Sequence, residues 1–333
     1  HWAAHWDDLD TASLLLGAAA NANAANDLGV TPLYLACANG SAAMVQALLA
    51  VGANPNAAAA TGVSPLMQAA RSGSVDAVQA LLARGANMTA TENSAGQTAL
   101  MWAVAQRHPE VVRALVMHGA DVRARSRTSG VLVNINRGGK GLGAHGPAKV
   151  VPTGGSTAML FAARVGCTEC AQALLAGGAN ANDAAPDGNS ALVLAAHSGQ
   201  GSFAAFLLDK DADPNAHGAG YTALHAAVLR GDLELVKALV AHGANPNTKL
   251  ENGTPLRREG PDYALPESLV GATAFLLAAK FADVEMMRVL STGGADVKLA
   301  AKDGTTPLVA AVNSERRQGG NYGGMTAEDS TSP

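Results

Sequence analysis

Hydrophobic positions recur along the chain in two short phrases that alternate. The first begins with Thr or Ser, continues with Pro or Ala, and then carries Leu and Ala, as at Thr31–Ala36 and Thr222–Ala227. The second is Leu-Leu-x-x-Gly-Ala-Asn-x-Asn, complete at Leu48–Asn56 and Leu174–Asn182. Apolar residues within each phrase follow an i, i+3, i+4 spacing, so each pair of phrases predicts two short amphipathic helices.

The pattern repeats at a nearly constant interval. The first phrase starts at positions 31, 64, 98, 157, 190, 222, 273 and 306, at spacings of 33, 34, 59, 33, 32, 51 and 33. A period of about 33 residues predicts stacked helical units rather than one central core. The two long intervals each predict a repeat plus an insertion.

Each phrase has a physical reason for its residues. Thr or Ser can cap the first helix, and a Pro at the first helical position has no amide hydrogen to leave unpaired. Glycine then follows the first helix, where a left-handed residue is needed, at positions 40, 73, 166, 199 and 231. Arg107 and Ala282 stand at that position in two copies, and we expect their turns to differ locally.

These phrases resemble the ankyrin repeat, and Gly231-Asp-Leu-Glu-Leu-Val is a close match to its middle element. The resemblance implies an all-α solenoid of about eight helix–turn–helix units with short β-hairpin loops. It also implies a protein-binding groove on the concave face, lined by loops and first helices. Long bacterial multi-ankyrin proteins with inserted loops are the most similar group.

The repeats divide the chain into segments. We expect ankyrin repeats over 1–126, 156–249 and 272–317, inserted loops at 127–155 and 250–271, and a flexible tail at 318–333. The first and last repeats look incomplete, because residues 1–4 align part-way into a first helix and the repeat at Thr306 lacks a second helix. The chain is therefore expected to be a fragment of a longer protein.

Composition narrows the functional classes. The chain is 48% hydrophobic but only 4% aromatic, with a net charge of −4, which gives no overall attraction to nucleic acid or to an anionic membrane. No apolar run approaches a membrane span. Three unevenly spread cysteines are too few for a disulfide framework, and three unpaired cysteines would be compatible with a reduced cytosol. The compartment stays open between exported and cytoplasmic.

The first insertion and its approach are basic. Arg123, Arg125 and Arg127 alternate along the chain and would point the same way if the backbone were extended. They predict either a patch for an anionic surface of the partner or an ordinary solvated loop. Gly141–Gly146 has the Gly-x-Gly-x-x-Gly spacing, but it lacks the strand and helix that a dinucleotide site requires, and we interpret it as a loop.

Cys167-Thr-Glu-Cys170 is the other unusual motif. A metal site would need two further ligands. A redox pair is a second possibility, and the favoured interpretation is structural, with Cys170 as a small core residue. The scattered histidines indicate no site: His225 holds a position of the repeat pattern, and His118 and His242 suit the ends of second helices. No catalytic, cofactor or metal site is predicted.

The better candidates are non-pattern residues expected on the concave face, since Trp, Tyr and Arg are the usual anchors of interfaces. Together with the three alternating arginines they are Arg71, Trp102, Gln106, Phe161, Arg164, His197, Tyr221, Arg230, Lys280 and Phe281. Trp102 and Phe161 could instead pack between repeats. The groove of the repeats starting at Thr157, Ser190 and Thr222, between the two insertions, is the expected centre of binding.

The sequence thus predicts a scaffold that binds a protein partner through the groove and inserted loops. A first alternative is a structural subunit that self-associates through uncapped repeat ends. A second, less favoured, is an enzyme or redox protein that uses Cys167 and Cys170.

Overall fold

Each copy of the repeat up to α16 folds into two helices joined by a tight turn, and a loop leads on to the next copy. The computed structural model describes residues 1–134, 148–251 and 269–312. The first helices are α1 Trp2–His5, α3 Pro32–Asn39, α5 Pro65–Ser72, α7 Ala99–Ala105, α9 Ala158–Val165, α11 Ala191–His197, α13 Ala223–Arg230, α15 Ala274–Lys280 and α17 Pro307–Val312. The second helices are α2 Leu9–Gly17, α4 Ala42–Ala50, α6 Val75–Ala83, α8 Pro109–Met117, α10 Thr168–Ala176, α12 Gly201–Leu208, α14 Leu233–Ala241 and α16 Val284–Thr292.

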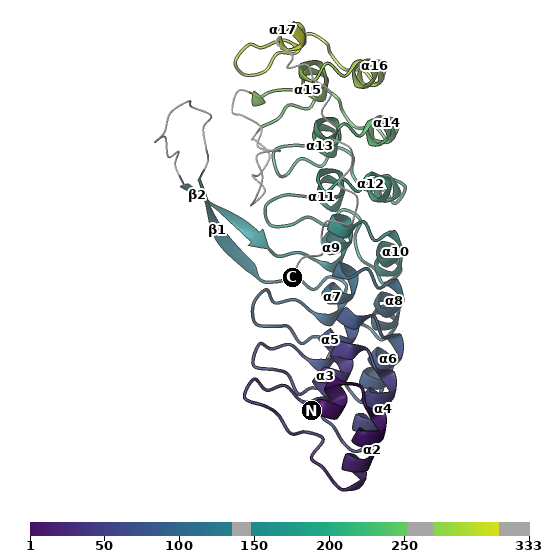
Figure 1. The fold of residues 1–333 in the computed structure, drawn as a ribbon. Coiled ribbons are helices and arrows are strands. Elements are labelled where there is room, and N and C mark those ends of the chain that lie inside the picture. Colours follow the sequence, from purple (N-terminus) through teal and green to yellow (C-terminus); the bar gives the residue numbers. More distant parts are fainter. Residues whose placement is uncertain (135–147, 252–268, 313–333) are drawn as a thin grey trace.

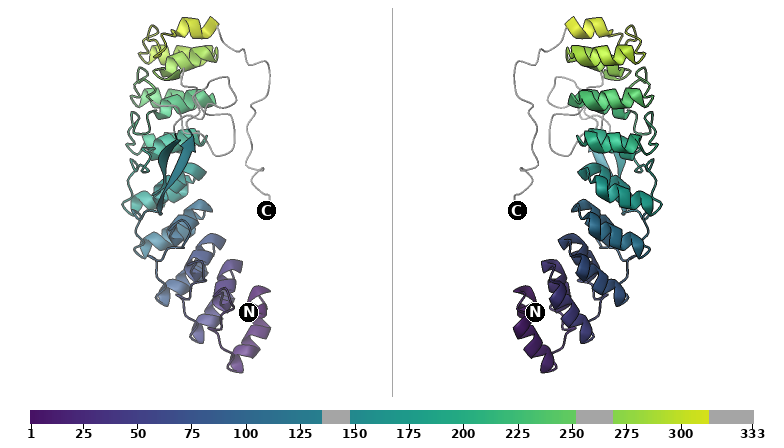
Figure 2. Two further views of the ribbon diagram at one scale, coloured as in Figure 1. Left: turned by 90° about the vertical axis from the view of Figure 1, so that its left-hand side faces the viewer. Right: turned by 90° about the vertical axis from the view of Figure 1, so that its right-hand side faces the viewer.

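The helices form two columns. First helices stack on first helices, as α3 on α5 and α5 on α7, and second helices stack on second helices, as α4 on α6. The first-helix column lies between the second helices and the loops (Figure 1), and the stack bends along its length (Figure 2). The described chain is therefore an all-α repeat solenoid, as predicted, with a single two-stranded hairpin added.

Helix capping follows the sequence pattern. The side chains of Thr31, Ser64 and Thr222 each accept a hydrogen bond from the backbone N–H three residues on, which satisfies a donor that the helix leaves free. Thr157 is an exception, because its hydroxyl donates to Asp183 Oδ2 at 2.8 Å and makes no cap bond.

From α1 to α15, the turn after each first helix uses one left-handed residue. Gly40 and Gly231 have φ of 71° and 74°, and Arg107 and Ala282 adopt the same region with φ of 59° and 51°. The expectation that these two turns differ was therefore wrong. Stacking on both sides fixes the turn, and a side chain there costs roughly 1–2 kcal/mol.

The core is a continuous stripe between the two columns rather than a central cluster. Leu48 and Leu49 are 3% exposed, and Leu174 is fully buried. Fully burying such a side chain stabilises the fold by roughly 1.5–3 kcal/mol. Alanines such as Ala36 and Ala227 are fully buried as well, and their small size lets neighbouring helices approach closely.

Asparagine side chains link successive loops. Asn215 donates from Nδ2 to Gly243 O at 3.1 Å and accepts from Asn245 N at 2.7 Å. Asn23, Asn56, Asn182 and Asn247 make the same pair of bonds to the next repeat. The second Asn of the repeat phrase therefore holds the register between units. Thr89 stands at this position in the third copy and bonds within its own loop.

The first insertion forms an antiparallel hairpin of β1 Thr128–Asn134 and β2 Ala148–Gly154, with Thr128 opposite Gly154. It projects from the loop side of the stack (Figure 1). The Gly141–Gly146 motif, most of the insertion predicted at 250–271 and the tail from 313 lie outside the described residues.

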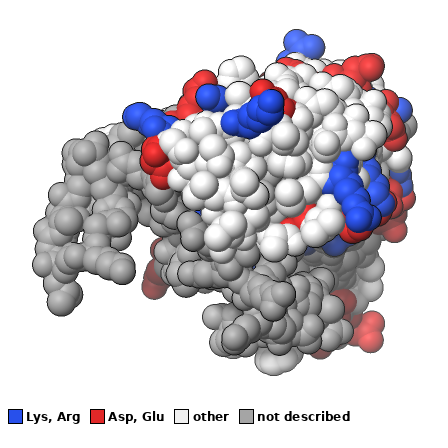
Figure 3. Space-filling view, turned by 90° about the horizontal axis from the view of Figure 1, so that it is seen from above, with Lys and Arg blue, Asp and Glu red and all other residues white. Residues whose placement is uncertain are grey.

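Apolar side chains are exposed at both ends of the described stack. Trp2 is 75% and Trp6 72% exposed at one end, and Leu308 is 76% and Val312 78% exposed at the other. Seen from above, the face around the last helices carries few charged side chains (Figure 3).

Candidate partner-binding surface

The last turns of the first helices bring several predicted residues onto one surface. Arg71, Arg164 and Lys280 lie in the last turns of α5, α9 and α15, each seven residues after the Ser or Thr that precedes its helix. The Arg71 and Arg164 side chains are exposed, and Lys280 is half-buried. Gln106, directly after α7, is exposed as well. The repeat thus places these polar side chains in one row along the stack.

Two aromatic rings lie beside two of these arginines. The Arg71 guanidinium is 6.0 Å from the centre of the Trp102 ring, and the Arg164 guanidinium is 5.7 Å from that of Phe161. Both rings are half-buried and pack against the core. Each ring therefore both supports the stack and presents one face to a cation, a contact worth about 0.5–1 kcal/mol at an exposed site.

Trp102 also lines a pocket of about 490 Å³ between two neighbouring loops. Residues 60–63 form one side and residues 92–97 the other. The Trp102 ring that lies beside the Arg71 guanidinium thus also lines the pocket, so an apolar group of a partner could enter it next to that ring.

Glu92 fixes the loop on one side of this pocket. Its carboxylate is 4% exposed and accepts hydrogen bonds from the backbone N–H groups of Ser94, Ala95 and Gln97 and from the Ser94 hydroxyl. Burial raises the pKa of Glu92, but these donors outweigh it and lower that pKa to about 2. An ionised side chain therefore shapes the pocket wall, which the sequence pattern did not reveal.

Tyr221 does not lie on this surface. Its side chain is 1% exposed, and its hydroxyl donates to Asn189 Oδ1 at 2.7 Å. Burial raises the pKa of the phenol. The prediction that Tyr221 contacts a partner is wrong, because the residue before the capping Thr points between adjacent loops and packs there.

The three alternating arginines do not point the same way. Arg125 donates to the carbonyls of Gly155 and Ala184, toward the following repeat, whereas Arg127 donates to Asn93 O, toward the preceding one. Arg123 sits in a turn and reaches Gly178 O at 3.5 Å. The expectation of one basic face is wrong, since these side chains brace the hairpin and the neighbouring loops.

Arg123 in fact occupies the position of the linking asparagines. It follows Asp121 by two residues, as Asn56 follows Asn54, and it makes an equivalent contact to the next repeat. The phrase Leu-Leu-x-x-Gly-Ala-Asn-x-Asn carried this signal, which sequence reasoning missed. The insertion also contains the basic residues Arg137 and Lys140, which lie outside the described residues.

The remaining candidates lie further along the stack. The Arg230 guanidinium donates to His197 O at 3.0 Å, and the His197 ring lies 6.4 Å from the Tyr221 ring. His197, Arg230 and Phe281 are half-buried. Several side chains in this part of the predicted groove thus contact one another within the solenoid.

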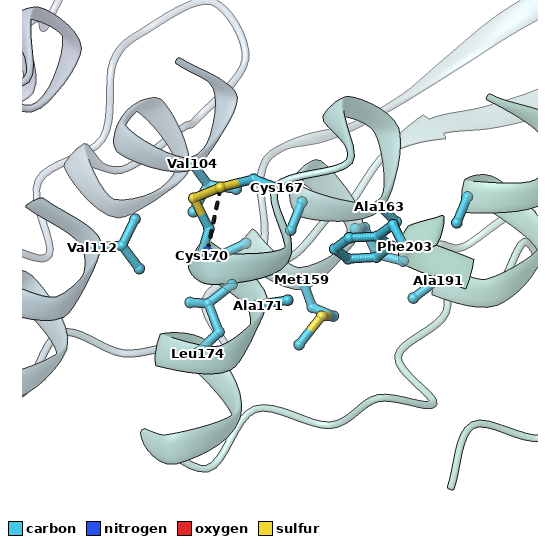
Figure 4. Packing of buried hydrophobic residues seen from close by; sticks show 14 of the residues in the cluster. Val104, Val112, Met159, Ala163, Cys167, Cys170, Ala171, Leu174, Ala191 and Phe203 are labelled. Carbon is cyan, nitrogen blue, oxygen red and sulfur yellow. Dashed lines mark hydrogen bonds between the residues drawn. A yellow bond between two sulfur atoms is a disulfide. The ribbon is translucent and has the colours of Figure 1, made fainter. Parts of the chain in front are cut away.

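Cys167 and Cys170 are joined by a disulfide, with the two Cα atoms 5.2 Å apart. Both are buried, 2% and 0% exposed, and they lie beside Val104 and Val112 of the preceding repeat (Figure 4). Cys167 caps α10 and accepts from Cys170 N, so the helix start brings the two sulfurs together. Cys170 is a core residue, as predicted, and it is paired, unlike the three unpaired cysteines that would suit a reduced cytosol.

The histidines noted in the sequence analysis make hydrogen bonds that stabilise the helices of the repeats. His225 is 1% exposed, and its Nδ1 lies 2.9 Å from the Thr222 hydroxyl. Burial lowers the pKa of His225 to about 4, despite backbone hydrogen bonds that favour the charged form. His118 and His242 each bond the carbonyl four residues earlier in their own helix. Within the described residues no group of three or more His, Cys, Asp or Glu is placed to hold a metal.

Residues 1–134, 148–251 and 269–312 contain no helix long and apolar enough to cross a membrane.

The geometry defines a class of protein: a helical repeat solenoid with an open surface formed by first helices and loops. Family models described as ankyrin repeats match residues 1–92, 60–126 and 140–218, and another matches 219–249. The chain belongs to the ankyrin-repeat family.

Individual relatives match parts of the chain. An ankyrin repeat-containing protein of Treponema pallidum (strain Nichols) is 43% identical over 94 residues, covering 28% of this chain and 32% of the relative. Human ankyrin repeat and SOCS box protein 6 is 36% identical over 112 residues, covering 26% of each. The chain thus spans a third or less of the length of these relatives.

Among solved structures, the human ASB11 ankyrin repeat domain aligns with a TM-score of 0.59 at 24% sequence identity. That alignment covers 80% of this chain and 99% of the domain. This similarity shows the shared solenoid fold.

Proposed function

We propose that this chain is a scaffold that binds a protein partner through the surface formed by Arg71, Trp102, Phe161 and Arg164, with the β1–β2 hairpin at its edge. One observation carries the proposal: two half-buried aromatic rings each lie beside an arginine, and one of them, Trp102, also lines an open pocket. Aromatic and arginine side chains at a pocket are typical of the energetic centre of an interface.

The proposed centre is displaced from the one expected from the sequence. The predicted groove began at Thr157 and extended toward Thr222, but Tyr221 is buried there and Arg230 bonds to His197 O. The repeats of α5, α7 and α9 combine exposed arginines with half-buried rings, so they offer the better-formed contact surface. Proteins of this family and fold typically bind proteins rather than catalyse reactions, which agrees with the prediction of no enzymatic activity.

A photo-crosslinking pair in one repeat tests the proposal. A photo-reactive amino acid is placed at Gln106, on the candidate surface, or at Met117, which ends α8 on the second-helix side and is 85% exposed. In extract from the organism that makes the protein, we expect a discrete protein adduct from position 106 and little from 117. Equal yields from both positions, or no adduct from 106, would contradict the proposal.

Self-association through the ends is the second candidate function. The exposed apolar side chains Trp2, Trp6, Leu308 and Val312 support it. Light scattering over a hundredfold concentration range separates the two. A constant monomer mass supports the scaffold, whereas a mass that rises with concentration and falls on Trp6→Ser supports assembly through that end.

A further inference from the structure

Charge is divided between the two helix columns. In residues 1–134, 148–251 and 269–312, the first helices contain no Asp or Glu, yet Arg71, Arg164, Arg230 and Lys280 lie in their last turns. The second helices carry the acidic residues, among them Glu110, Glu169, Glu234 and Glu285. The last turns of the first helices are therefore basic on a chain whose net charge is −4, and the loops beside them carry the carboxylates of Glu92 and Asp187.

The cations of the two columns also differ in their partners. On the second helices, Arg113, Lys237 and Arg288 each pair with the glutamate three residues earlier. Among the described residues, Arg71, Arg164 and Lys280 form no salt bridge. Partial burial of the guanidinium lowers the pKa of Arg164, and the charge of Asp187 acts in the opposite direction. Arg164 also donates to Ser156 Oγ at 3.2 Å, and its other N–H groups, like those of Arg71 and Lys280, can still bind a carboxylate.

The rings beside two of these arginines orient them. A guanidinium held beside an aromatic face still has N–H groups available to a carboxylate. Arg71 is on α5, Trp102 on α7, and Phe161 and Arg164 on α9, three first helices that pack in succession. The two cations therefore flank an aromatic stretch, with the pocket at Trp102 opening beside it.

We infer, resting on the proposed function, that this surface binds an extended acidic segment of the partner protein, with carboxylates at Arg71 and Arg164 and a bulky apolar side chain beside Trp102. Packed helices lie roughly 8–10 Å apart, so the two arginines are separated by about 18 Å. An extended peptide spans that distance in about five or six residues. The acidic residues of the segment should be spaced accordingly.

Selection from a random 12-residue peptide display library on the full chain tests the inference. We expect enrichment of net-negative peptides in which acidic residues five or six positions apart flank a Leu, Phe or Trp. Enrichment of neutral or basic peptides that still bind at this surface would overturn the acidic inference and leave the proposed function intact. Failure of every selected peptide to crosslink at position 106 would count against both.

The most enriched acidic peptide, labelled with fluorescein, is then titrated by fluorescence anisotropy. Arg71→Gln with Arg164→Gln should raise Kd at least tenfold, and raising NaCl from 50 to 300 mM should abolish most of the difference from wild type. The matched control, Arg113→Gln with Arg288→Gln, removes two paired arginines of the second helices and should change Kd less than twofold. An equal effect of both double variants would overturn the inference.

Other anionic macromolecules are the competing occupants. A 20-nucleotide oligothymidine and vesicles with 30% phosphatidylserine are titrated in parallel with the peptide. Tighter binding of either than of the acidic peptide would overturn the inference. Melting curves of each variant, within 2 °C of wild type, confirm that the exposed substitutions leave the solenoid folded.

Discussion

Glu92→Gln should loosen the loop that forms one wall of the Trp102 pocket. The carboxylate accepts from three backbone N–H groups and one hydroxyl while 4% exposed. A glutamine keeps one oxygen and turns an NH₂ group toward N–H donors, so buried donors lose their acceptor. The change therefore tests whether one ionised side chain organises residues 92–97.

The magnitude follows from the pKa. The pKa of Glu92 falls from an ordinary 4.5 to about 2, and each pH unit corresponds to about 1.4 kcal/mol, so ionisation stabilises the loop by about 3 kcal/mol at neutral pH. Because the folded-state pKa is the lower one, this stabilisation is complete above pH 4.5. It is lost as the pH falls from 4.5 toward 2.

Hydrogen exchange read by mass spectrometry measures the effect locally, which suits a solenoid whose units open separately. At pH 7 the Ser94, Ala95 and Gln97 amides of Glu92→Gln should lose protection by about 100-fold, the equivalent of about 3 kcal/mol. Glu169→Gln, which changes an exposed glutamate of α10, is the matched control and should leave these amides unchanged. Unchanged protection in Glu92→Gln, or equal loss in both variants, would refute the reasoning.

Three further predictions concern the repeat itself. Arg107→Gly should raise the unfolding free energy by up to about 1 kcal/mol in urea melts, because Arg107 holds φ 59° and glycine adopts that region without the penalty; a lower value would contradict this. Asn215→Ala should cost about 1–3 kcal/mol through two lost bonds to the next repeat, whereas Thr89→Ala, at the same position without such bonds, should cost less than half as much. His225 has a pKa of about 4 in the folded chain, so between about pH 6.5 and 4 the imidazole binds a proton in the unfolded state but not in the folded one. The unfolding free energy of the wild type should therefore fall from pH 6.5 to 4 more steeply than that of His225→Gln. Parallel curves for the two proteins would rule this out.

Much of the fold could be predicted because each structural feature of the repeat depends on residues that are close together in the sequence. Thr31 and Ser64 cap helices, and buried leucines such as Leu48 lie at the expected positions. Each such feature depends on residues within one unit and its neighbour, so a pattern of about 33 residues is sufficient to specify it. Even Arg107 and Ala282 follow the unit's geometry, since the stack imposes the turn on residues that do not favour it.

The candidate surface was harder to predict because exposure depends on contacts between units. Arg71 and Trp102 were candidates because of their repeat positions, but their proximity of 6.0 Å emerged only from the stacking of α5 on α7. Tyr221, the candidate before the Thr of its repeat, packs between loops instead. The repeat pattern predicts which helix a residue belongs to, but it does not predict which residue of the neighbouring repeat its side chain contacts.

The repeat, its helix pairs and the absence of acidic residues from the first helices follow directly from the amino-acid order, because these are properties of each short unit. Which side chains stay available to a partner depends instead on how the units stack. The tertiary structure turned Arg125 and Arg127 in opposite directions, joined Cys167 to Cys170 and left Arg71 and Arg164 beside aromatic rings. The physical reason is that a side chain's environment in a solenoid is completed by the adjacent unit, whose residues lie some thirty or more positions away in the chain.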